Sequence, residues 1–345
     1  MNASKATSPK AMTTEEKPAL KKKDFVTDQE VRWCPGCGDY AILTGVQQTF
    51  ATLGIPKEEF VVVSGIGCSS RFPYYMDTYG FHTIHGRAPA LASGVKIANP
   101  NLQVWMVTGD GDALSIGGNH IIHAARRNMD IKVLLFNNRI YGLTKGQYSP
   151  TSPPGTKTGS TPYGSLDAPF NPISLMLGAG ASFVARAVDT QIPHLKTVLQ
   201  TAHEHKGFAF VEILQNCNIF NDKAFEHIVG KDIRDDRQVD LRPGQPMVYG
   251  KDLEKGLCFA HGGIDIVSAD EAQTWDSEEP AGSLAYRICQ GAEDADVPVP
   301  IGIFRQVQQS TLDSAIHEQI QQTTNNLGEG TLSSLLSAGE TWQVG

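Results

Sequence analysis

The chain has 345 residues, of which 40% are hydrophobic and 19% charged, and its formal net charge is −8 at pH 7. This length and apolar content allow a large buried core in one or two domains, whereas an acidic chain repels phosphate backbones, so we exclude nucleic acid as a partner. No apolar run reaches the ~18 residues of a membrane span and the start of the chain lacks the apolar core of a secretory signal, so we expect a cytoplasmic protein without a membrane segment.

The first 23 residues form a basic segment with six Lys against two Glu. They show neither helical nor strand periodicity, and they are rich in Thr, Ala, Ser and Pro. Such a composition does not build a packed core. We therefore predict a mobile basic tail over residues 1–23 and assign the first folded domain to residues 24–217.

The six cysteines are better explained by metal or redox chemistry than by disulfides, because we expect a cytoplasmic chain. Cys34 and Cys37 form a Cys-x-x-Cys pair whose Pro-Gly turn can direct both sulfurs to one side. Cys68 and Cys217 each follow an apolar segment with the composition of a strand. Thiols in such places bind zinc or a cluster, act as a dithiol redox pair or, for a lone Cys, simply pack.

The segment between Gly109 and Asn138 has the spacing of a site that holds a diphosphate through a divalent metal. Apolar runs at 104–107 and 131–136 predict two strands, and residues 119–127 between them suit a helix. A right-handed β-α-β unit places Asp110 and Asn138 at the carboxyl edge of a parallel sheet. Their oxygens can share one Mg²⁺ with diphosphate oxygens, so the segment predicts thiamine diphosphate binding.

Five motifs in one order resemble the β subunit of 2-oxoacid:ferredoxin oxidoreductases, over about residues 31–217. The segments that carry the resemblance are Trp-Cys-Pro-Gly-Cys-Gly at 33–38, Gly-Ile-Gly-Cys-Ser at 65–69, His-Thr-Ile-His-Gly-Arg-Ala at 82–88, Gly-Asp-Gly-Asp-Ala at 109–113 and Asn-Asn-Arg-Ile-Tyr-Gly at 137–142. The resemblance implies an α/β fold, namely the diphosphate-binding half of a thiamine diphosphate fold, with helices flanking a parallel sheet.

The same resemblance implies a set of site residues. Cys34, Cys37, Cys68 and Cys217 would hold a [4Fe-4S] cluster. Mg²⁺ would be bound by Asp110, Asn138 and the carbonyl of Ile140. The cofactor would be contacted by residues of four loops, namely Ile66, Gly67, Cys68, Ser69, His85, Gly109, Asp110, Gly111, Asn138, Gly142 and Leu143.

Two cationic side chains are candidates for catalysis or substrate binding. His85 can donate a hydrogen bond to a diphosphate, whereas His120 and His123, at helical spacing, suit packing or surface positions. Arg71 can pair with a substrate carboxylate in a bidentate manner, although a surface salt bridge would explain it as well. Lys145 is a weaker candidate of the same kind.

The implied reaction is the oxidative decarboxylation of a 2-oxoacid with coenzyme A to an acyl-CoA and CO₂. Electrons would pass through the cluster to ferredoxin, and the family's reaction is reversible, so it also fixes CO₂. Thiamine diphosphate enzymes need a Glu against the aminopyrimidine ring, and the family supplies that Glu from the α subunit. We therefore expect a chain that is inactive alone and works as an αβ pair or an (αβ)₂ assembly.

The remaining segments carry less information. Residues 150–172 are rich in Pro, Gly, Thr and Ser and predict a long loop beside the cofactor site. Helix 192–203 and strand 208–214 then complete the domain. Residues 218–345 are expected to form a C-terminal extension that packs on the core or on the partner subunit.

Three alternatives remain open at this point. The substrate is expected to be 2-oxoglutarate because of the long C-terminal part, the opening segment Cys-Pro-Gly-Cys-Gly-Asp-Tyr-Ala-Ile-Leu at 34–43 and the availability of Arg71 for a second carboxylate. A pyruvate-type enzyme has the same core. A non-redox thiamine diphosphate decarboxylase β subunit explains Asp110 and Asn138 but leaves the cysteines without a role. A zinc-stabilised interaction subunit explains the cysteines but leaves Asp110 and Asn138 without one.

Overall fold

The computed structural model describes residues 20–260, 262–291, 296–342 and 344. The expected tail at 1–23 lies mostly outside the described residues; its last residues begin a short 3₁₀ helix, Lys22–Phe25. In the described part of the chain, no helix is both long and apolar enough to cross a membrane.

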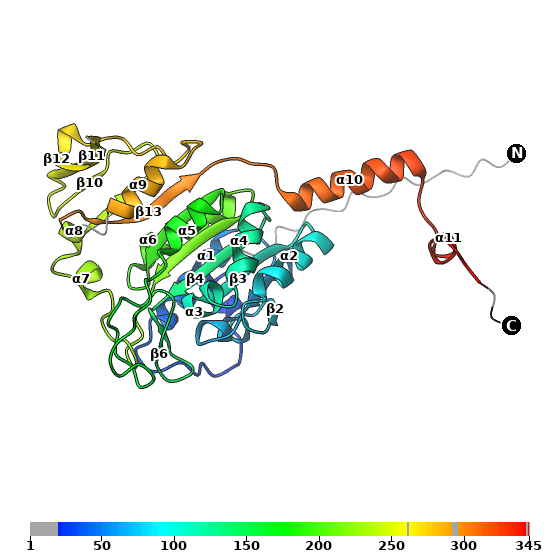
Figure 1. Ribbon diagram of the computed structural model, residues 1–345, viewed down its shortest axis with the longest axis horizontal. Coiled ribbons are helices and arrows are strands. Elements are labelled where there is room, and N and C mark those ends of the chain that lie inside the picture. Colours follow the sequence, from blue (N-terminus) through cyan, green and yellow to red (C-terminus); the bar gives the residue numbers. More distant parts are fainter. Residues whose placement is uncertain (1–19, 261, 292–295, 343, 345) are drawn as a thin grey trace, which may run out of the picture.

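A single eight-stranded sheet forms the centre of the molecule (Figure 1). All neighbours in it are parallel except the pair β7 and β13. The strands in spatial order are β2 (Tyr79–His82), β1 (Phe60–Ser64), β3 (Gln103–Gly109), β4 (Lys132–Asn137), β8 (Ala209–Leu214), β7 (Phe183–Val188), β13 (Val299–Gln306) and β9 (Gln238–Leu241). The predicted parallel α/β fold is confirmed.

Helices cover both faces of this sheet, which explains why its strands are apolar throughout. One face carries α1 (Asp39–Thr52) and α6 (Ile192–Glu204). The other face carries α2 (Ala88–Ala98), α4 (Gly118–Arg126), α5 (Pro172–Gly178) and α9 (Ser283–Gly291). Each face has its own hydrophobic core. In β3, Val104 and Met106 belong to the core under α2 and α4, whereas Trp105 and Val107 belong to the core under α1 and α6, as the two-residue period of a strand requires.

The β-α-β unit predicted around the Gly-Asp-Gly turn is present. The strands β3 and β4 pair in parallel, and α4 lies in the connection between them. This helix begins one residue before the expected one. A short helix that the sequence did not indicate, α3 (Asp110–Leu114), follows β3 directly. The loop at 150–172 has no regular structure until α5 begins at Pro172.

The chain after residue 217 does more than pack on the core, because β13 and β9 complete the central sheet. The expected boundary at 217 therefore divides a sheet to which both parts contribute. A small antiparallel sheet lies beyond it, built from β10 (Val248–Tyr249), β11 (Lys255–Ala260) and β12 (Gly263–Ser268). The other short elements are the hairpin of β5 (Ile140–Tyr141) and β6 (Gln147–Tyr148), the helices α7 (Glu226–Val229) and α8 (Arg234–Arg237), and the 3₁₀ helices Lys57–Glu59, Ser69–Tyr75 and Ala269–Glu271.

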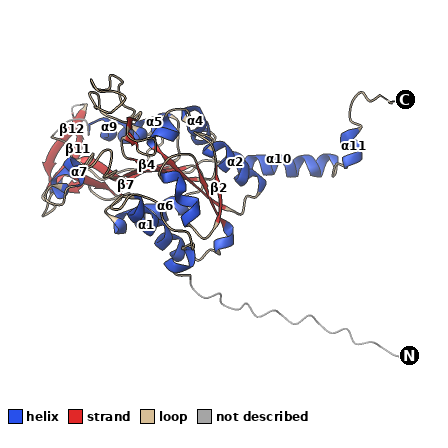
Figure 2. Ribbon diagram, turned by 90° about the horizontal axis from the view of Figure 1, so that it is seen from below, coloured by secondary structure: helices blue, strands red, loops and turns tan. Residues whose placement is uncertain are grey.

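The chain ends in two helices outside this body. Helix α10 (Leu312–Leu327) leaves the body beside α2, and α11 (Leu332–Leu336) follows it, as both ribbon views show (Figures 1 and 2).

Candidate active site

The topology creates a ligand site between β1 and β3. The chain passes from β1 to its outer neighbour β2 and then returns to β3 on the other side, so the loops after β1 and β3 diverge. In open α/β folds, ligands bind at such a point, outside the carboxyl ends of the strands. Strand β4 also ends at this edge, because it runs parallel to β3.

A pocket occupies this point, and it gathers the predicted cofactor residues from four separate loops. These loops follow β1, β2, β3 and β4. The predicted residues that line the pocket are Ile66, Gly67, Cys68, Ser69, His85, Gly109, Asp110, Gly111, Asn138, Ile140, Gly142 and Leu143. Residues that lie up to 77 positions apart in the sequence thus share one wall.

Asp110 provides the strongest electrostatic feature of this pocket. Its side chain is buried, and one carboxylate oxygen accepts hydrogen bonds from the hydroxyls of Ser149 and Thr151, each at 2.5 Å. Burial raises the pKa of the Asp110 carboxyl, since the charged form loses its water. Among the described residues, no Lys, Arg or His forms an ion pair with it. A buried carboxylate with no cation in ion-pair contact fits a divalent metal ion.

Asn138 and Ile140, which line the same pocket as Asp110, form a tight turn. The side-chain oxygen of Asn138 accepts from the backbone N–H of Ile140 at 3.1 Å, and Arg139 between them has φ 57°. This turn directs the Ile140 end of the loop into the pocket. Thr151 links this turn to Asp110, because its hydroxyl bonds the Asp110 carboxylate and also lies 3.0 Å from the side-chain oxygen of Asn137.

Ser69 supplies a second sign that the pocket accepts a polar ligand. Its hydroxyl is buried and has no hydrogen-bond partner in the described part of the chain. Buried hydroxyls are normally paired, because an unpaired one costs about 1–3 kcal/mol. A diphosphate oxygen bound in the pocket would provide the missing partner, so the pocket fits the diphosphate of thiamine diphosphate.

Asp112 organises the wall that carries His85. Its carboxylate accepts from the backbone N–H of Gly86 at 2.9 Å and from the hydroxyl of Thr108 at 2.9 Å, and it lies 3.2 Å from His85 Nδ1. A Cβ on Gly65 would stand only 1.8 Å from this carboxylate, so Gly65 must lack a side chain. His85 itself is 56% exposed at the rim of the pocket.

The four predicted cysteine ligands lie beside the same pocket. A Cβ on Gly142 would stand 3.6 Å from the sulfurs of both Cys68 and Cys217. Burial raises the pKa of the Cys68 thiol to about 12, and repulsion from Asp39, Cys217 and Cys34 adds to that rise. Burial also raises the pKa of Cys37, with further repulsion from Asp39, Cys217 and Cys68. The four thiols therefore share one region.

No three His, Cys, Asp or Glu side chains within the described residues have the arrangement of a metal-ion site. Instead, hydrogen bonds hold the cysteine loops together. Trp33 donates its indole N–H to the carbonyl of Cys68 at 2.7 Å, and Asn218 donates to the carbonyl of Pro35 at 2.7 Å. Asn221 donates to the carbonyl of Asn138 at 2.9 Å, which connects the loop of Cys217 to the predicted magnesium loop. These three contacts link the loops of all four cysteines to one another and to the loop of Asn138.

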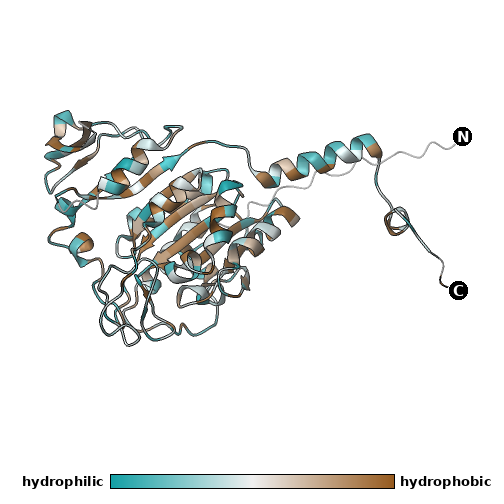
Figure 3. Cartoon of the chain, viewed as in Figure 1, coloured by the Kyte–Doolittle hydropathy of each residue, from teal (hydrophilic) through white to brown (hydrophobic). Residues whose placement is uncertain are grey.

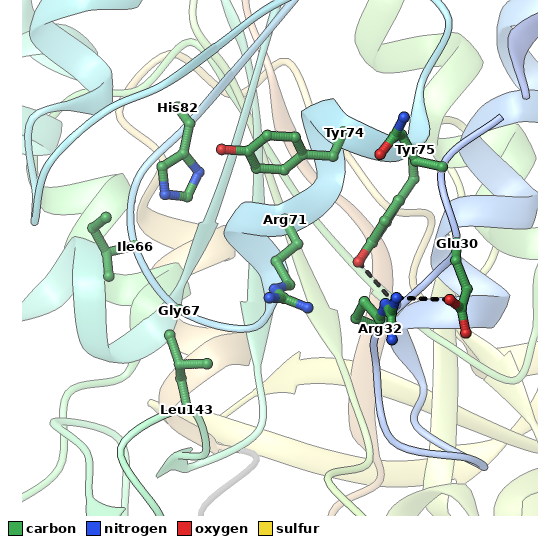
Figure 4. A pocket seen from close by; sticks show the side chains of 10 residues that line it. Glu30, Arg32, Ile66, Gly67, Arg71, Tyr74, Tyr75, His82 and Leu143 are labelled. Atoms are coloured by element: carbon green, nitrogen blue, oxygen red, sulfur yellow. Dashed lines mark hydrogen bonds and ion pairs between the residues drawn. The ribbon is translucent and has the colours of Figure 1, made fainter. Parts of the chain in front are cut away.

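Arg71 lies in a second, larger pocket next to the first (Figure 4). The two pockets share Ile66, Gly67 and Leu143, and the guanidinium of Arg71 points into the space beside Leu143. Arg32 lies across this space, where it pairs with Glu30 at 2.8 Å. No ion pair of Arg71 is found among the described residues, so its charge is available to a ligand.

Several pocket residues were not predicted from the sequence. Asp39, Asp112 and Tyr141 line the first pocket, and Ser149 and Thr151 lie behind Asp110. Burial, together with repulsion from Asp189, raises the pKa of Asp39 to about 7. The second Asp of Gly-Asp-Gly-Asp was a readable signal for Asp112. The role of the hydroxyls depends on how the loop after β6 folds back, which no local pattern indicates.

Comparisons with known proteins agree with this geometry. The family model "Thiamine pyrophosphate enzyme, C-terminal TPP binding domain" matches residues 65–213, which include the pocket loops. The chain is 50% identical over 331 residues to the 2-oxoglutarate oxidoreductase subunit KorB of Mycobacterium tuberculosis, and the match covers 94% of this chain and 88% of the relative. It is also 50% identical over 190 residues to subunit β of the 2-oxoacid:ferredoxin oxidoreductase 1 of Aeropyrum pernix, covering 55% of this chain and 60% of that relative.

A solved structure is similar over almost the whole chain. It is the 2-oxoglutarate:ferredoxin oxidoreductase from Magnetococcus marinus with 2-oxoglutarate, coenzyme A and succinyl-CoA bound. The TM-score is 0.76 at 33% identity, and the match covers 94% of this chain and 97% of the solved chain.

Proposed function

Because this chain belongs to the β subunits of the 2-oxoacid:ferredoxin oxidoreductases, which are thiamine diphosphate-dependent enzymes, we propose that it oxidises 2-oxoglutarate with its α subunit. The products are succinyl-CoA, CO₂ and two electrons, which a ferredoxin receives. When bound, thiamine diphosphate supplies a carbon nucleophile for the 2-oxo carbon and a [4Fe-4S] cluster accepts electrons one at a time. The observation that carries this proposal is the position of Cys68, which lines the cofactor pocket while its sulfur and that of Cys217 both lie beside Gly142.

The residues after β3 and β4 hold the diphosphate end of the cofactor in this proposal. Asp110, Asn138 and the carbonyl of Ile140 bind Mg²⁺, because all three are hard oxygen donors on one pocket wall. Ser149 and Thr151 orient the Asp110 carboxylate through their hydroxyl donors. The side chain best placed to reach the diphosphate from the rim is His85, which Asp112 holds in position.

The four cysteines Cys34, Cys37, Cys68 and Cys217 bind the cluster. Their thiols give up protons to do so, because only thiolates are ligands. The carbonyls of Pro35 and Cys68 are already held by Asn218 and Trp33, so the cluster loops are tied to each other before the cluster binds. Cys258 and Cys289 are not part of this set.

The partner α subunit completes the thiamine diphosphate site. The pocket described above contacts one end of the cofactor, and the Glu that the aminopyrimidine ring requires comes from the α subunit. The functional unit is thus an αβ pair, and we propose an (αβ)₂ assembly. The isolated β chain is expected to show no 2-oxoacid oxidation.

Arg71 selects a substrate with two carboxylates. Its side chain lines the second pocket, which adjoins the cofactor pocket, and a carboxylate is the natural bidentate partner of a guanidinium. Lys145, whose backbone has φ 75°, lies exposed on the loop next to Leu143 and offers a second positive charge. Both features favour 2-oxoglutarate over pyruvate.

Purified αβ complex tests this proposal. Reduction of a ferredoxin or of a viologen dye is measured with coenzyme A and each of 2-oxoglutarate, pyruvate, a branched 2-oxoacid and indolepyruvate. We expect kcat/KM to be highest with 2-oxoglutarate, and Arg71→Leu to raise its KM at least tenfold while pyruvate is unaffected. A tenfold preference for pyruvate would overturn the substrate, and a colourless protein without broad visible absorption would overturn the cluster.

A further inference from the structure

A charged side chain stands inside the apolar central sheet, close to the predicted magnesium loop. Glu212 lies in β8 between Val211 and Ile213, and only 1% of its surface is exposed. The strands around it are mostly apolar, as the hydropathy view shows (Figure 3). A buried carboxylate is costly unless donors reach its oxygens, so the partners of Glu212 indicate its role.

Arg186 neutralises this carboxylate from the neighbouring strand. Arg186 on β7 is the register partner of Glu212, and its Nε donates to Oε2 of Glu212 at 2.7 Å. The guanidinium also donates to the carbonyl of Pro300 at 3.1 Å and lies over the ring of Phe304, 5.4 Å from its centre. Pro300 and Phe304 belong to β13, so this strand holds the Arg186 guanidinium in place beside Glu212.

The other oxygen of Glu212 holds the side-chain amide of Asn137, at the end of β4. Nδ2 of Asn137 donates to Oε1 of Glu212 at 2.7 Å. Leu135 is the register partner of Glu212 in β4, and Asn137 follows two residues later on the same face of that strand. An ionised carboxylate only accepts hydrogen bonds, so the amide nitrogen of Asn137 must face it and the amide oxygen must point elsewhere.

The amide oxygen of Asn137 forms the first turn of the magnesium loop. Its Oδ1 accepts from the backbone N–H of Arg139 at 3.2 Å, and Oδ1 of Asn138 accepts from that of Ile140 at 3.1 Å. An Asn side chain that bonds the N–H two residues on folds the backbone into a turn, and Arg139 adopts φ 57° within it. The turn that presents Asn138 and Ile140 to the pocket therefore begins at an oxygen whose direction Glu212 determines.

We propose that Glu212 is a positioning residue for the divalent metal ion, because it fixes the Asn137 amide and thereby the turn that carries the oxygens of Asn138 and Ile140. Glu212 is not among the residues that line the cofactor pocket, so it acts through Asn137. This inference rests on the proposed function, in which the loop after β4 binds Mg²⁺. It assigns a role at the metal site to Arg186 and β13 as well, since they hold the Glu212 carboxylate.

Replacement of Glu212 by Gln tests the orientation of the Asn137 amide. Gln keeps the shape but offers one acceptor and one donor in place of two acceptors. The Arg186 guanidinium takes the Gln oxygen, because bonds from charged donors are stronger, so the Gln nitrogen faces the nitrogen of Asn137. The Asn137 amide then flips and turns its nitrogen toward the N–H of Arg139. We expect Mn²⁺ affinity to fall roughly 10- to 100-fold, the usual cost of losing a group that orients metal ligands.

Exchange of the two side chains provides the rescue. In the double variant Asn137→Asp with Glu212→Gln, the Gln nitrogen donates to the Asp carboxylate, whose other oxygen accepts from the N–H of Arg139. We expect about half or more of the lost affinity, on a logarithmic scale, to return. Asn137→Asp alone controls for the added charge near the metal. It should bind Mn²⁺ more weakly than the double variant at pH 8, because its carboxylate faces that of Glu212.

The measurement uses the αβ complex, prepared without oxygen, freed of metal and titrated with Mn²⁺ in the presence of thiamine diphosphate. Free Mn²⁺ is followed by electron paramagnetic resonance at a temperature well below the Tm of each variant. Asp130→Asn is the matched control for the loss of a buried ion pair. Asp130 is buried and accepts from the Lys132 ammonium at 2.8 Å, but it precedes β4, at the end opposite Asn137. We expect this control to lower Tm and to leave Mn²⁺ affinity within about twofold of the parent.

The outcomes separate this inference from the proposed function. Unchanged affinity in Glu212→Gln, an equal loss in Asp130→Asn or no recovery in the double variant would overturn the role of Glu212. If Glu212→Gln does not assemble with the α subunit, the double variant and Asn137→Asp decide, and equal affinities of these two would overturn it. Unaltered Mn²⁺ binding in Asp110→Asn would instead refute the metal site itself.

Discussion

Replacement of Gly111 by Ala tests whether the turn after β3 must remain free of side chains for the cofactor to bind. A Cβ at this position would lie 2.2 Å from Cε1 of Tyr141, whereas ordinary carbon contacts are about 3.5–4.0 Å. The Tyr141 ring must therefore move by more than 1 Å. Its hydroxyl also donates to the carbonyl of Gly111 at 2.9 Å, and that bond would be strained or lost.

Overpacking of this kind typically costs about 1–3 kcal/mol. If this cost raises the free energy of the cofactor-bound pocket relative to the empty pocket, thiamine diphosphate affinity drops by roughly 5- to 150-fold, since about 1.4 kcal/mol corresponds to a factor of ten. The αβ complex would be titrated with thiamine diphosphate and Mg²⁺ by calorimetry, and its iron content measured in parallel. We expect the iron content to be unchanged, because Gly111 contacts none of the four cysteines.

Two comparisons make this reasoning refutable. Gly118→Ala is the matched control, because a Cβ there meets nothing within 4 Å, and it should bind the cofactor normally. Tyr141→Leu combined with Gly111→Ala frees space and should recover part of the affinity. Unaltered affinity in Gly111→Ala, or an equal loss in Gly118→Ala, would show that the contact with Tyr141 does not govern binding.

Three further changes address other parts of the site and the core. Asp110→Asn keeps the shape but removes the charge, so Mn²⁺ affinity measured by electron paramagnetic resonance should fall at least 100-fold; a fall below threefold would contradict metal binding there. Asn221→Ala removes a donor worth about 1 kcal/mol, so thiamine diphosphate should bind roughly fivefold more weakly, and unchanged binding would argue against coupling of the two loops. Burial lowers the pKa of His205 to about 4. Because this lies below its ordinary value of about 6.5, stability is complete above pH 6.5 and is lost as pH falls toward 4, by about 2 kcal/mol between pH 7 and 5. His205→Gln should therefore show a flatter dependence of Tm on pH than the parent, and an identical dependence would exclude this histidine.

The positions of Asp110 and Asn138 at the pocket could be predicted from the sequence because strand ends carry local signals. An apolar run that stops at Gly-Asp-Gly places Asp110 at a sheet edge, and Asn138 follows from the next strand in the same way. The hydroxyls of Ser149 and Thr151 were not predictable, because they reach Asp110 through a loop with no periodic pattern. For the same reason β13 was missed as a sheet member. It begins at residue 299, far beyond both of its partners, β7 (Phe183–Val188) and β9 (Gln238–Leu241), and a strand that pairs over such a distance has no local mark of where it pairs.

The proposed cluster site and the proposed thiamine diphosphate site lie next to each other because several strands end at one edge of the sheet. Cys68 follows β1, Asp110 follows β3, Asn138 follows β4 and Cys217 follows β8, so a parallel sheet brings thiols and metal-binding oxygens to the same side. An antiparallel arrangement of β1, β3, β4 and β8 would have sent alternate residues to the opposite edge. The order of strands also matters, since β1, β3, β4 and β8 are consecutive neighbours in the sheet. A short path from the proposed cofactor site to the proposed cluster would thus be a consequence of the topology itself, and Asn221 and Trp33 refine it by fixing the loops to one another.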